Sequence, residues 1–240
     1  MLDQKIGFCT TDDGVRICYA TVGKGPPLVK APNWLTHLEF EWQSPVWGHW
    51  WVELASHHTV IRFDQRGSGL SDWIVDDLSF DAWVSDLEAV VEALQLEQFV
   101  LLGISQGGPV AIEFTARHPE KVEKLLLYGT YSRGRVKRGG SVEEEKAVST
   151  LTRHGWGRDD PAYRQMFTSQ FMPEATSEQA NWFNELQRVS TSPENAARVQ
   201  ETTAYIDVLD RLPGVSVPTL VLHAVNAAGS HMSKGARSVL

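Results

Sequence analysis

The sequence predicts an α/β fold, in which a mostly parallel, twisted sheet carries helices on both faces. Short apolar segments alternate along the chain with segments of helical periodicity, and this alternation is typical of parallel sheets. Residues 99–102 and 125–127 are almost continuously apolar, as expected for strands buried on both sides. The length of 240 residues is sufficient for one domain with a full core.

The composition of the chain argues against a nucleic-acid-binding protein, a membrane-spanning protein and a metalloprotein. A net charge of −8 argues against a nucleic-acid partner, and no apolar run approaches the ~20 residues of a membrane span. The N-terminus shows no signal peptide, so we expect a cytoplasmic protein without a membrane partner. The two cysteines, Cys9 and Cys18, are too few for a metal site, and the sequence implies neither a metal nor a cofactor.

The first strands are predicted at residues 6–11 and 15–22. If Asp13-Gly14 forms a two-residue turn between them, Cys9 faces Cys18 across the hairpin. A disulfide is then geometrically conceivable, although cytosolic thiols are expected to stay reduced.

Two further strands are predicted at residues 28–31 and 59–63, with a helix between them. The intervening segment, 34–55, holds five tryptophans. We interpret them mainly as core residues, and Trp34 is the best candidate to line a pocket. A helix capped by Ser79 follows, because apolar residues then recur at helical spacing.

The next segment contains the motif Gly-x-Ser-x-Gly at residues 103–107. A bare match arises by chance in roughly one chain in ten of this length, so its context carries the prediction. The strand at 99–102 precedes it, and a helix with Pro109 in its first turn follows and ends at His118. This context is typical of a nucleophile elbow, which makes Ser105 the candidate nucleophile.

The C-terminal half changes character after a strand at residues 122–128. Residues 129–217 are polar and broken by Gly and Pro, which predicts several short helices with caps at Ser141 and at Thr191 or Ser192. A last strand is predicted at 218–223. We therefore expect a core made of residues 1–128 and 218–240 and an inserted helical lid at 129–217 over the carboxyl ends of the strands, where open α/β sheets bind ligands.

Four features together resemble the α/β-hydrolase family over nearly the whole chain. They are the D-x-R-G-x-G-x-S loop at 64–71, the elbow, the helical insertion and the P-T-L-V-L-H strand at 218–223. The T-S-P-E-N sequence at 191–195 resembles a bacterial group of such hydrolases, whose relatives are joined to cyclase or DNA-binding regulator domains.

The resemblance implies that Ser105 is the nucleophile and that backbone N–H groups form an oxyanion hole. The donors would be Gln106 and, in the loop after the strand at 28–31, Trp34; each such donor contributes roughly 3–4 kcal/mol. Asp64 and Arg66 are expected to hold their loop in place rather than to catalyse.

The resemblance also implies an acid and then a histidine after Ser105 in chain order. The residue at the acid position is Ala227, and the sequence stops at Leu240 before the strand that precedes the histidine. We therefore expect the last strand and helix of the usual fold to be missing, either by natural truncation or because the tail around 229–232 is foreign. His231 and His37 are substitute candidates for the base, and His223 is expected in the core.

The predicted function is hydrolysis of small-molecule carboxylic esters with small to medium acyl chains, through an acyl-enzyme on Ser105. The alternative is a catalytically impaired ligand-binding or regulatory module of the same fold. A missing strand would leave a sheet edge open, so we expect a homo-oligomer in which another subunit covers it.

Overall fold

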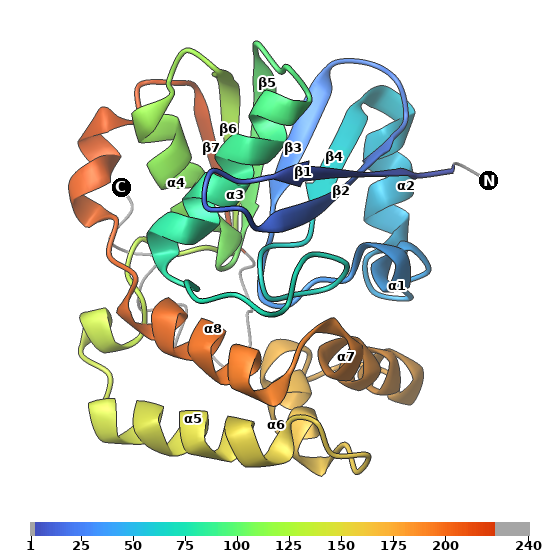
Figure 1. The fold of residues 1–240 in the computed structure, drawn as a ribbon, viewed down its shortest axis with the longest axis vertical. Helices are drawn as coiled ribbons and strands as arrows, with labels where there is room; N and C mark the ends of the chain where they lie inside the picture. The colour runs from blue at the N-terminus through green and yellow to red at the C-terminus, as the bar shows by residue number, and fades with distance from the viewer. Residues whose placement is uncertain (1–2, 224–240) are drawn as a thin grey trace.

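The computed structural model describes residues 3–223 and contains, in that range, a sheet of seven strands in the order β1-β2-β4-β3-β5-β6-β7 (Figure 1). Strands β3 to β7 are parallel, and β1 and β2 form an antiparallel hairpin at one edge. The mostly parallel sheet is thus confirmed. The strands are β1 (Lys5–Thr10), β2 (Arg16–Val22), β3 (Pro27–Ala31), β4 (Thr59–Phe63), β5 (Phe99–Ile104), β6 (Val122–Tyr128) and β7 (Thr219–Leu222).

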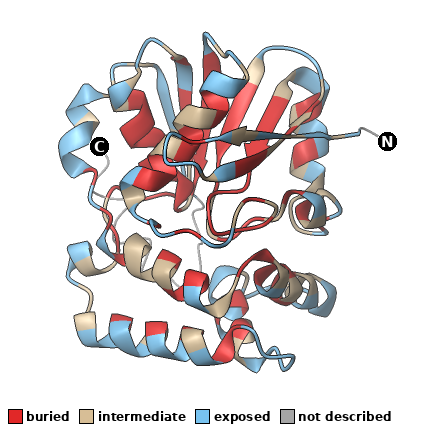
Figure 2. Ribbon diagram, in the orientation of Figure 1, coloured by how far each residue is buried: buried red, intermediate tan, exposed pale blue. Residues whose placement is uncertain are grey.

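Helices cover both faces of the sheet, as predicted. Alternate residues of β3 divide between two cores, with Leu28 packing toward α2 and Val29 toward α3 and α4. Figure 2 shows the resulting buried layers, and each fully buried aliphatic side chain contributes about 1.5–3 kcal/mol. These helices are α1 (Leu38–Trp42), α2 (Gly48–His57), α3 (Phe80–Ala93) and α4 (Gly107–Arg117). Helix α1 was not predicted separately, because five residues are too few to show a period.

Most of the helices between β6 and β7 lie at the carboxyl ends of the strands, below the sheet in the view of Figure 1. Ser141 caps α5 and Ser192 caps α8, each through its hydroxyl. The helices are η1 (Val136–Arg138), α5 (Val142–Gly155), α6 (Ala162–Phe171), α7 (Ser177–Ser190), α8 (Pro193–Tyr205) and η2 (Leu209–Gly214), of which α5 to α8 form what we call the cap. Helix η2 packs on α4 of the core. Within residues 3–223, none of the helices has the length and apolarity to cross a membrane.

Side chains at the start of α8 attach the cap to the loop that follows β4. The hydroxyl of Thr191 donates to the carbonyl of Gly67. Asn195 Nδ2 donates to the same carbonyl at 3.2 Å and to that of Trp73 at 2.8 Å. One helical turn later, Arg198 Nη1 donates to the carbonyl of Val75 at 2.9 Å. The T-S-P-E-N segment therefore fixes the position of the cap over the sheet.

The N-terminal hairpin corrects the predicted register. The N–H of Thr11 donates to the carbonyl of Val15 at 3.0 Å, so the loop has three residues rather than two. Its last residue, Gly14, has φ +85°, which is the usual geometry of a three-residue hairpin. Cys9 then pairs with Ile17 instead of Cys18. A shift by one residue turns side chains to opposite faces, so both cysteines are free thiols.

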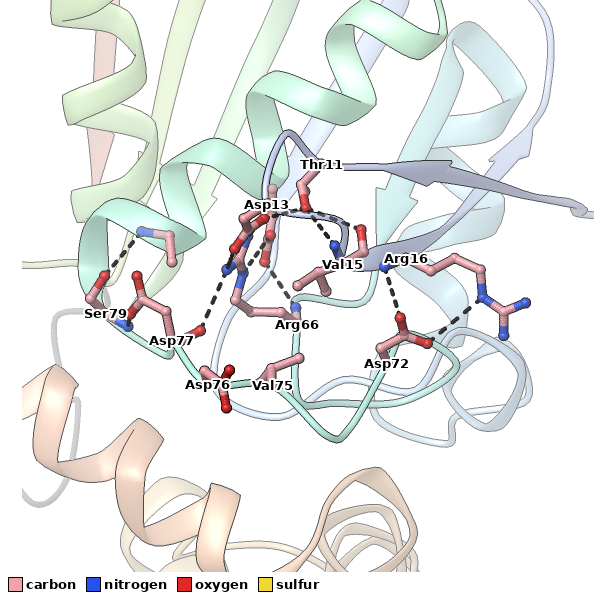
Figure 3. A network of polar contacts seen from close by, with 12 residues as sticks. Thr11, Asp13, Val15, Arg16, Arg66, Asp72, Val75, Asp76, Asp77 and Ser79 are labelled. Carbon is pink, nitrogen blue, oxygen red and sulfur yellow. Dashed lines mark hydrogen bonds and ion pairs between the residues drawn. The ribbon is translucent and has the colours of Figure 1, made fainter.

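An ion-pair network holds the loop after β4 against the hairpin and α3 (Figure 3); Arg66 and Asp86 are buried, and Asp13 is half-exposed. Arg66 Nε donates to Asp86 Oδ1 at 2.8 Å, and Arg66 Nη1 donates to Asp13 Oδ2 at 2.6 Å. The Arg66 hydrogen bonds hold the pKa of Asp13 at about 2. Burial raises the pKa of Asp86 to about 7, and Arg66 opposes that shift. These contacts give Arg66 a structural role.

We predict that Arg66→Met lowers the free energy of unfolding by about 3–5 kcal/mol, because it leaves the Asp86 carboxyl buried without its partner. Urea unfolding followed by circular dichroism measures this change. The control is Arg16→Met, which removes an exposed 3.8 Å pair with Asp72 and should cost less than about 1 kcal/mol. If both variants lost the same free energy of unfolding, the structural role assigned to Arg66 would be contradicted.

Candidate active site

Ser105 lies directly after β5 with a φ of +48°, in the left-handed region that non-glycine residues rarely adopt. Its backbone is fixed on both sides. The N–H donates to the carbonyl of Tyr128 at 3.0 Å, and the carbonyl accepts from the Thr130 hydroxyl at 2.6 Å. Such a conformation costs about 1–3 kcal/mol and persists only where neighbours hold it. The elbow predicted from the motif is therefore present, and it presents the serine at the end of the sheet.

Three glycines let the elbow pack tightly. A Cβ on Gly103 would lie 2.7 Å from the Cα of Gly108, and one on Gly107 would lie 2.7 Å from the carbonyl oxygen of Pro32. A Cβ on Gly108 would collide with the Thr130 side chain. Glycine is therefore needed where α4 begins, because the backbone there passes directly against the loop after β3.

The two predicted oxyanion donors lie at the ends of adjacent parallel strands. Trp34 follows β3 and has a φ of +52°, and Gln106 follows Ser105 as the N-cap of α4. Within residues 3–223, neither backbone N–H donates a hydrogen bond to another protein atom. The start of α4 adds the positive end of its helix dipole. The third non-glycine residue with positive φ, Gln95, follows the C-cap of α3, where this conformation is ordinary.

A cavity of about 120 Å³ opens in front of Ser105. Core and cap both build its wall, which is mainly apolar. The lining residues are Asn33, Trp34, Leu35, Glu41, Trp47, Ile104, Ser105, Phe171, Met172, Phe183 and Leu186. Typical sites for drug-sized ligands measure about 300–1,000 Å³, so this cavity suits a small group.

Trp34 connects the loop after β3 with the cap. Its ring stacks on Phe167 at 5.9 Å between centroids and contacts Trp156 edge-on at 5.8 Å. Trp34 thus lines the cavity as predicted, and Trp47 joins it. Trp51 is fully buried in the core. Because cap aromatics touch Trp34, the position of the cap affects the backbone that carries one of the two candidate donors.

Glu41 is a site residue that sequence reasoning missed. It lies on α1, is only 6% exposed and lines the cavity with Ser105. Burial raises its pKa, while Lys30 and Arg62 on neighbouring strands favour its charged form. An acid between aromatic residues in a five-residue helix was the available signal, but the helix is too short to show which side it buries.

The described residues do not supply the base of a catalytic triad. Within 3–223, no histidine or carboxylate is hydrogen-bonded to the Ser105 hydroxyl. His37 caps α1, with Nδ1 accepting from the N–H of Phe40 at 3.3 Å, and it does not line the cavity. Ala227 and His231 lie outside the described residues.

The core position predicted for His223 is wrong. His223 is exposed and lies just beyond the end of β7. Within residues 3–223, β7 is an edge strand and three of its four residues are exposed, so a position next to this strand does not ensure burial.

A larger cavity of about 580 Å³ lies beside Arg66, away from Ser105. Its lining includes Asp12, Asp13, Asp77 and Asp81, so it is strongly acidic. It does not include Ser105, whereas the smaller cavity is lined by that strained serine and by Trp34, whose backbone N–H is unpaired within residues 3–223. We therefore assign the candidate active site to the smaller cavity. In the described part of the chain, no group of three or more His, Cys, Asp or Glu side chains could hold a metal ion.

Comparison with known proteins gives consistent matches. Residues 43–226 match the family model described as "alpha/beta hydrolase fold". The AB hydrolase superfamily protein YisY of Bacillus subtilis is 29% identical over 231 residues, covering 90% of this chain and 80% of that protein.

Solved structures of other proteins have the same fold as this chain. An esterase from Exiguobacterium antarcticum superposes with a TM-score of 0.82 at 24% identity, covering 97% of this chain and 85% of its own. A thermophilic esterase from Thermogutta terrifontis has a TM-score of 0.76 at 23% identity, covering 98% and 86%. At these identities the structural likeness concerns the fold alone.

We predict that Gly108→Ala disturbs the elbow, because its Cβ would collide with Thr130 and displace the hydroxyl that holds the Ser105 carbonyl. The reaction rate of Ser105 with a fluorophosphonate probe should fall at least tenfold. The control is Gly214→Ala, at a glycine without a positive φ, where the added Cβ would make only an ordinary contact of 3.5 Å with the Cβ of Ala116; it should keep the wild-type rate. An unchanged rate in Gly108→Ala would contradict the account of tight packing.

Proposed function

The chain belongs to the alpha/beta hydrolase fold family, and from this premise we propose that it is a serine hydrolase that cleaves small carboxylic esters through an acyl-enzyme on Ser105. The observation that carries the proposal is the strained Ser105 at a small, mainly apolar cavity that Trp34 also lines. Within residues 3–223, the backbone N–H groups of Trp34 and of Gln106, the residue after Ser105, are unpaired. Small to medium acyl chains were expected, and a cavity of about 120 Å³ favours the short end of that range.

The proposed reaction has two steps. Ser105 Oγ attacks the ester carbonyl, its proton passes to a base, and the tetrahedral oxyanion is held by the N–H groups of Gln106 and Trp34. The C–O bond to the leaving group then breaks as the base returns the proton to its oxygen, which releases the alcohol and leaves an ester on Ser105. Water hydrolyses that ester, releases the carboxylic acid and restores the serine hydroxyl.

A ligand-binding or regulatory module of the same fold is the second candidate. The observation that favours it is that no described histidine or carboxylate is hydrogen-bonded to Ser105. Both candidates use the same cavity, so a test of chemistry at Ser105 separates them.

We predict that the wild-type protein hydrolyses p-nitrophenyl butyrate and is labelled by a fluorophosphonate probe, and that Ser105→Ala loses both activities. Release of nitrophenolate and the intact mass of the protein measure them. Ser85→Ala, on α3 beside the acidic cavity, is the control and should behave as wild type. Enzymes without a complete triad can retain about 10³–10⁴-fold catalysis over water, so rates are compared with that level.

If the wild-type protein neither turns over the ester nor takes up label beyond the Ser105→Ala background, the hydrolase proposal is wrong. The ligand-binding reading then stands.

The homo-oligomer stays a prediction. Light scattering at micromolar concentration should give a mass that is a multiple of the 26.8 kDa chain. A monodisperse monomer would refute it.

A further inference from the structure

Among the described residues that line the Ser105 cavity, Glu41 is the one ionisable side chain. The other walls are mostly aromatic or aliphatic. A buried carboxylate needs hydrogen-bond donors, because an unsatisfied buried acceptor is costly. The residues around Glu41 therefore indicate which kind of hydrogen-bond donor a ligand should carry.

Arg62, the cation closest to Glu41, makes its hydrogen bonds with other residues. Arg62 Nη1 lies 3.8 Å from Glu41 Oε2, which is too long for a hydrogen bond. Arg62 Nη2 donates instead to Gln4 Oε1 at 2.9 Å, and its guanidinium lies 4.7 Å from the ring of Trp51. Arg62 thus balances the charge of Glu41 without occupying its oxygens.

Lys30 and His37 are two other neighbours that act on the charge of Glu41. Lys30 lies beside Arg62 in the register of β3 and β4, and burial lowers its pKa to about 8. A backbone hydrogen bond from His37 also favours the charged form of Glu41. Within residues 3–223, no side chain lies within hydrogen-bond distance of the Glu41 carboxylate, so it keeps acceptor positions for a ligand.

The charges around Glu41 select the kind of donor. Lys30 and Arg62 face Glu41 and the buried Asp64, so two cations already compensate two carboxylates. An ammonium group on the ligand would add an uncompensated buried charge, and a ligand carboxylate would be repelled by Glu41. A hydroxyl adds no charge and can bond to either protonation state of the carboxyl group.

We propose that Glu41 is a specificity-determining residue that binds a hydroxyl group of the substrate, so that the preferred substrates are short hydroxy-acyl esters. This rests on the proposed function, since the ester must be held at Ser105 while its hydroxyl contacts Glu41. The small cavity leaves room for only a few carbon atoms between the two groups.

The test compares each of two hydroxy esters with its deoxy partner. The pairs are p-nitrophenyl lactate with propionate and p-nitrophenyl 3-hydroxybutyrate with butyrate. In the wild type, kcat/KM for at least one hydroxy ester should exceed that of its partner about 10- to 100-fold, as expected for a hydrogen bond to a charged group. Because both esters are measured on the same protein sample, the ratio of their kcat/KM values does not depend on the fraction of active protein.

Variants of Glu41 then show whether it causes the preference. Glu41→Leu should bring the ratio to within about twofold of one, and the near-isosteric Glu41→Gln should lower it at least threefold. Glu41→Gln decides the matter if loss of the counter-charge to Arg62 prevents Glu41→Leu from folding. Glu39→Gln, at an exposed position of the same helix, should keep the wild-type ratio. A wild-type ratio near one, or an unchanged ratio in both Glu41 variants, would overturn the proposal.

Binding separates this proposal from the proposed function. In Ser105→Ala, ethyl 3-hydroxybutyrate should bind about tenfold tighter than ethyl butyrate by tryptophan fluorescence, and Glu41→Gln should reduce that difference. Discrimination in binding without any hydrolysis by the wild type would leave Glu41 its role and refute the hydrolase. Hydrolysis without discrimination would refute the role of Glu41 alone.

Discussion

The close approach between the start of α4 and the loop after β3 is the constraint on which the site depends. Gly107 lies where a Cβ would meet the carbonyls of Pro32 and Ala31, and Gly103 lies against Gly108 across the turn. This contact forces Ser105 into the left-handed region and brings the loop that carries Trp34 against the elbow. The candidate nucleophile and the loop that carries one candidate N–H donor thus lie at the same end of the sheet, next to the second candidate donor at Gln106.

The cap completes a cavity that the core alone would leave open. Asn195 and Arg198 on α8 donate hydrogen bonds to backbone carbonyls of the loop after β4. Arg66 and Asp86 hold the same loop from the opposite side, against α3. Aromatic residues of α6 and α7 can therefore close over Trp34 at a defined place. The elbow and the walls of the cavity thus come from distant parts of the sequence, which two polar networks hold together.

Much of the fold and the elbow could be predicted from the sequence because their signals are local. The strands follow apolar runs, Ser79, Ser141 and Ser192 cap the helices expected of them, and Gly-x-Ser-x-Gly marks the turn at Ser105. The hairpin register was wrong because the choice between a two- and a three-residue loop depends on the conformation of Gly14.

The walls of the cavity could not be predicted, because they depend on contacts between elements far apart in the chain. The charge of Glu41 is balanced by Lys30 and Arg62, which lie on separate strands. Phe171 and Phe183 line the cavity only because the cap packs on the core. Helical periodicity gives the buried side of a helix but not the element that it faces.

In the proposed reaction, Ser105 itself forms a covalent bond to the substrate. This bond can be detected by mass spectrometry of peptides from protein quenched during turnover of a short ester. The expected result is a mass increment of one acyl group on the peptide that contains Ser105. An acyl group on another residue, or turnover with no adduct at any time after mixing, would contradict it.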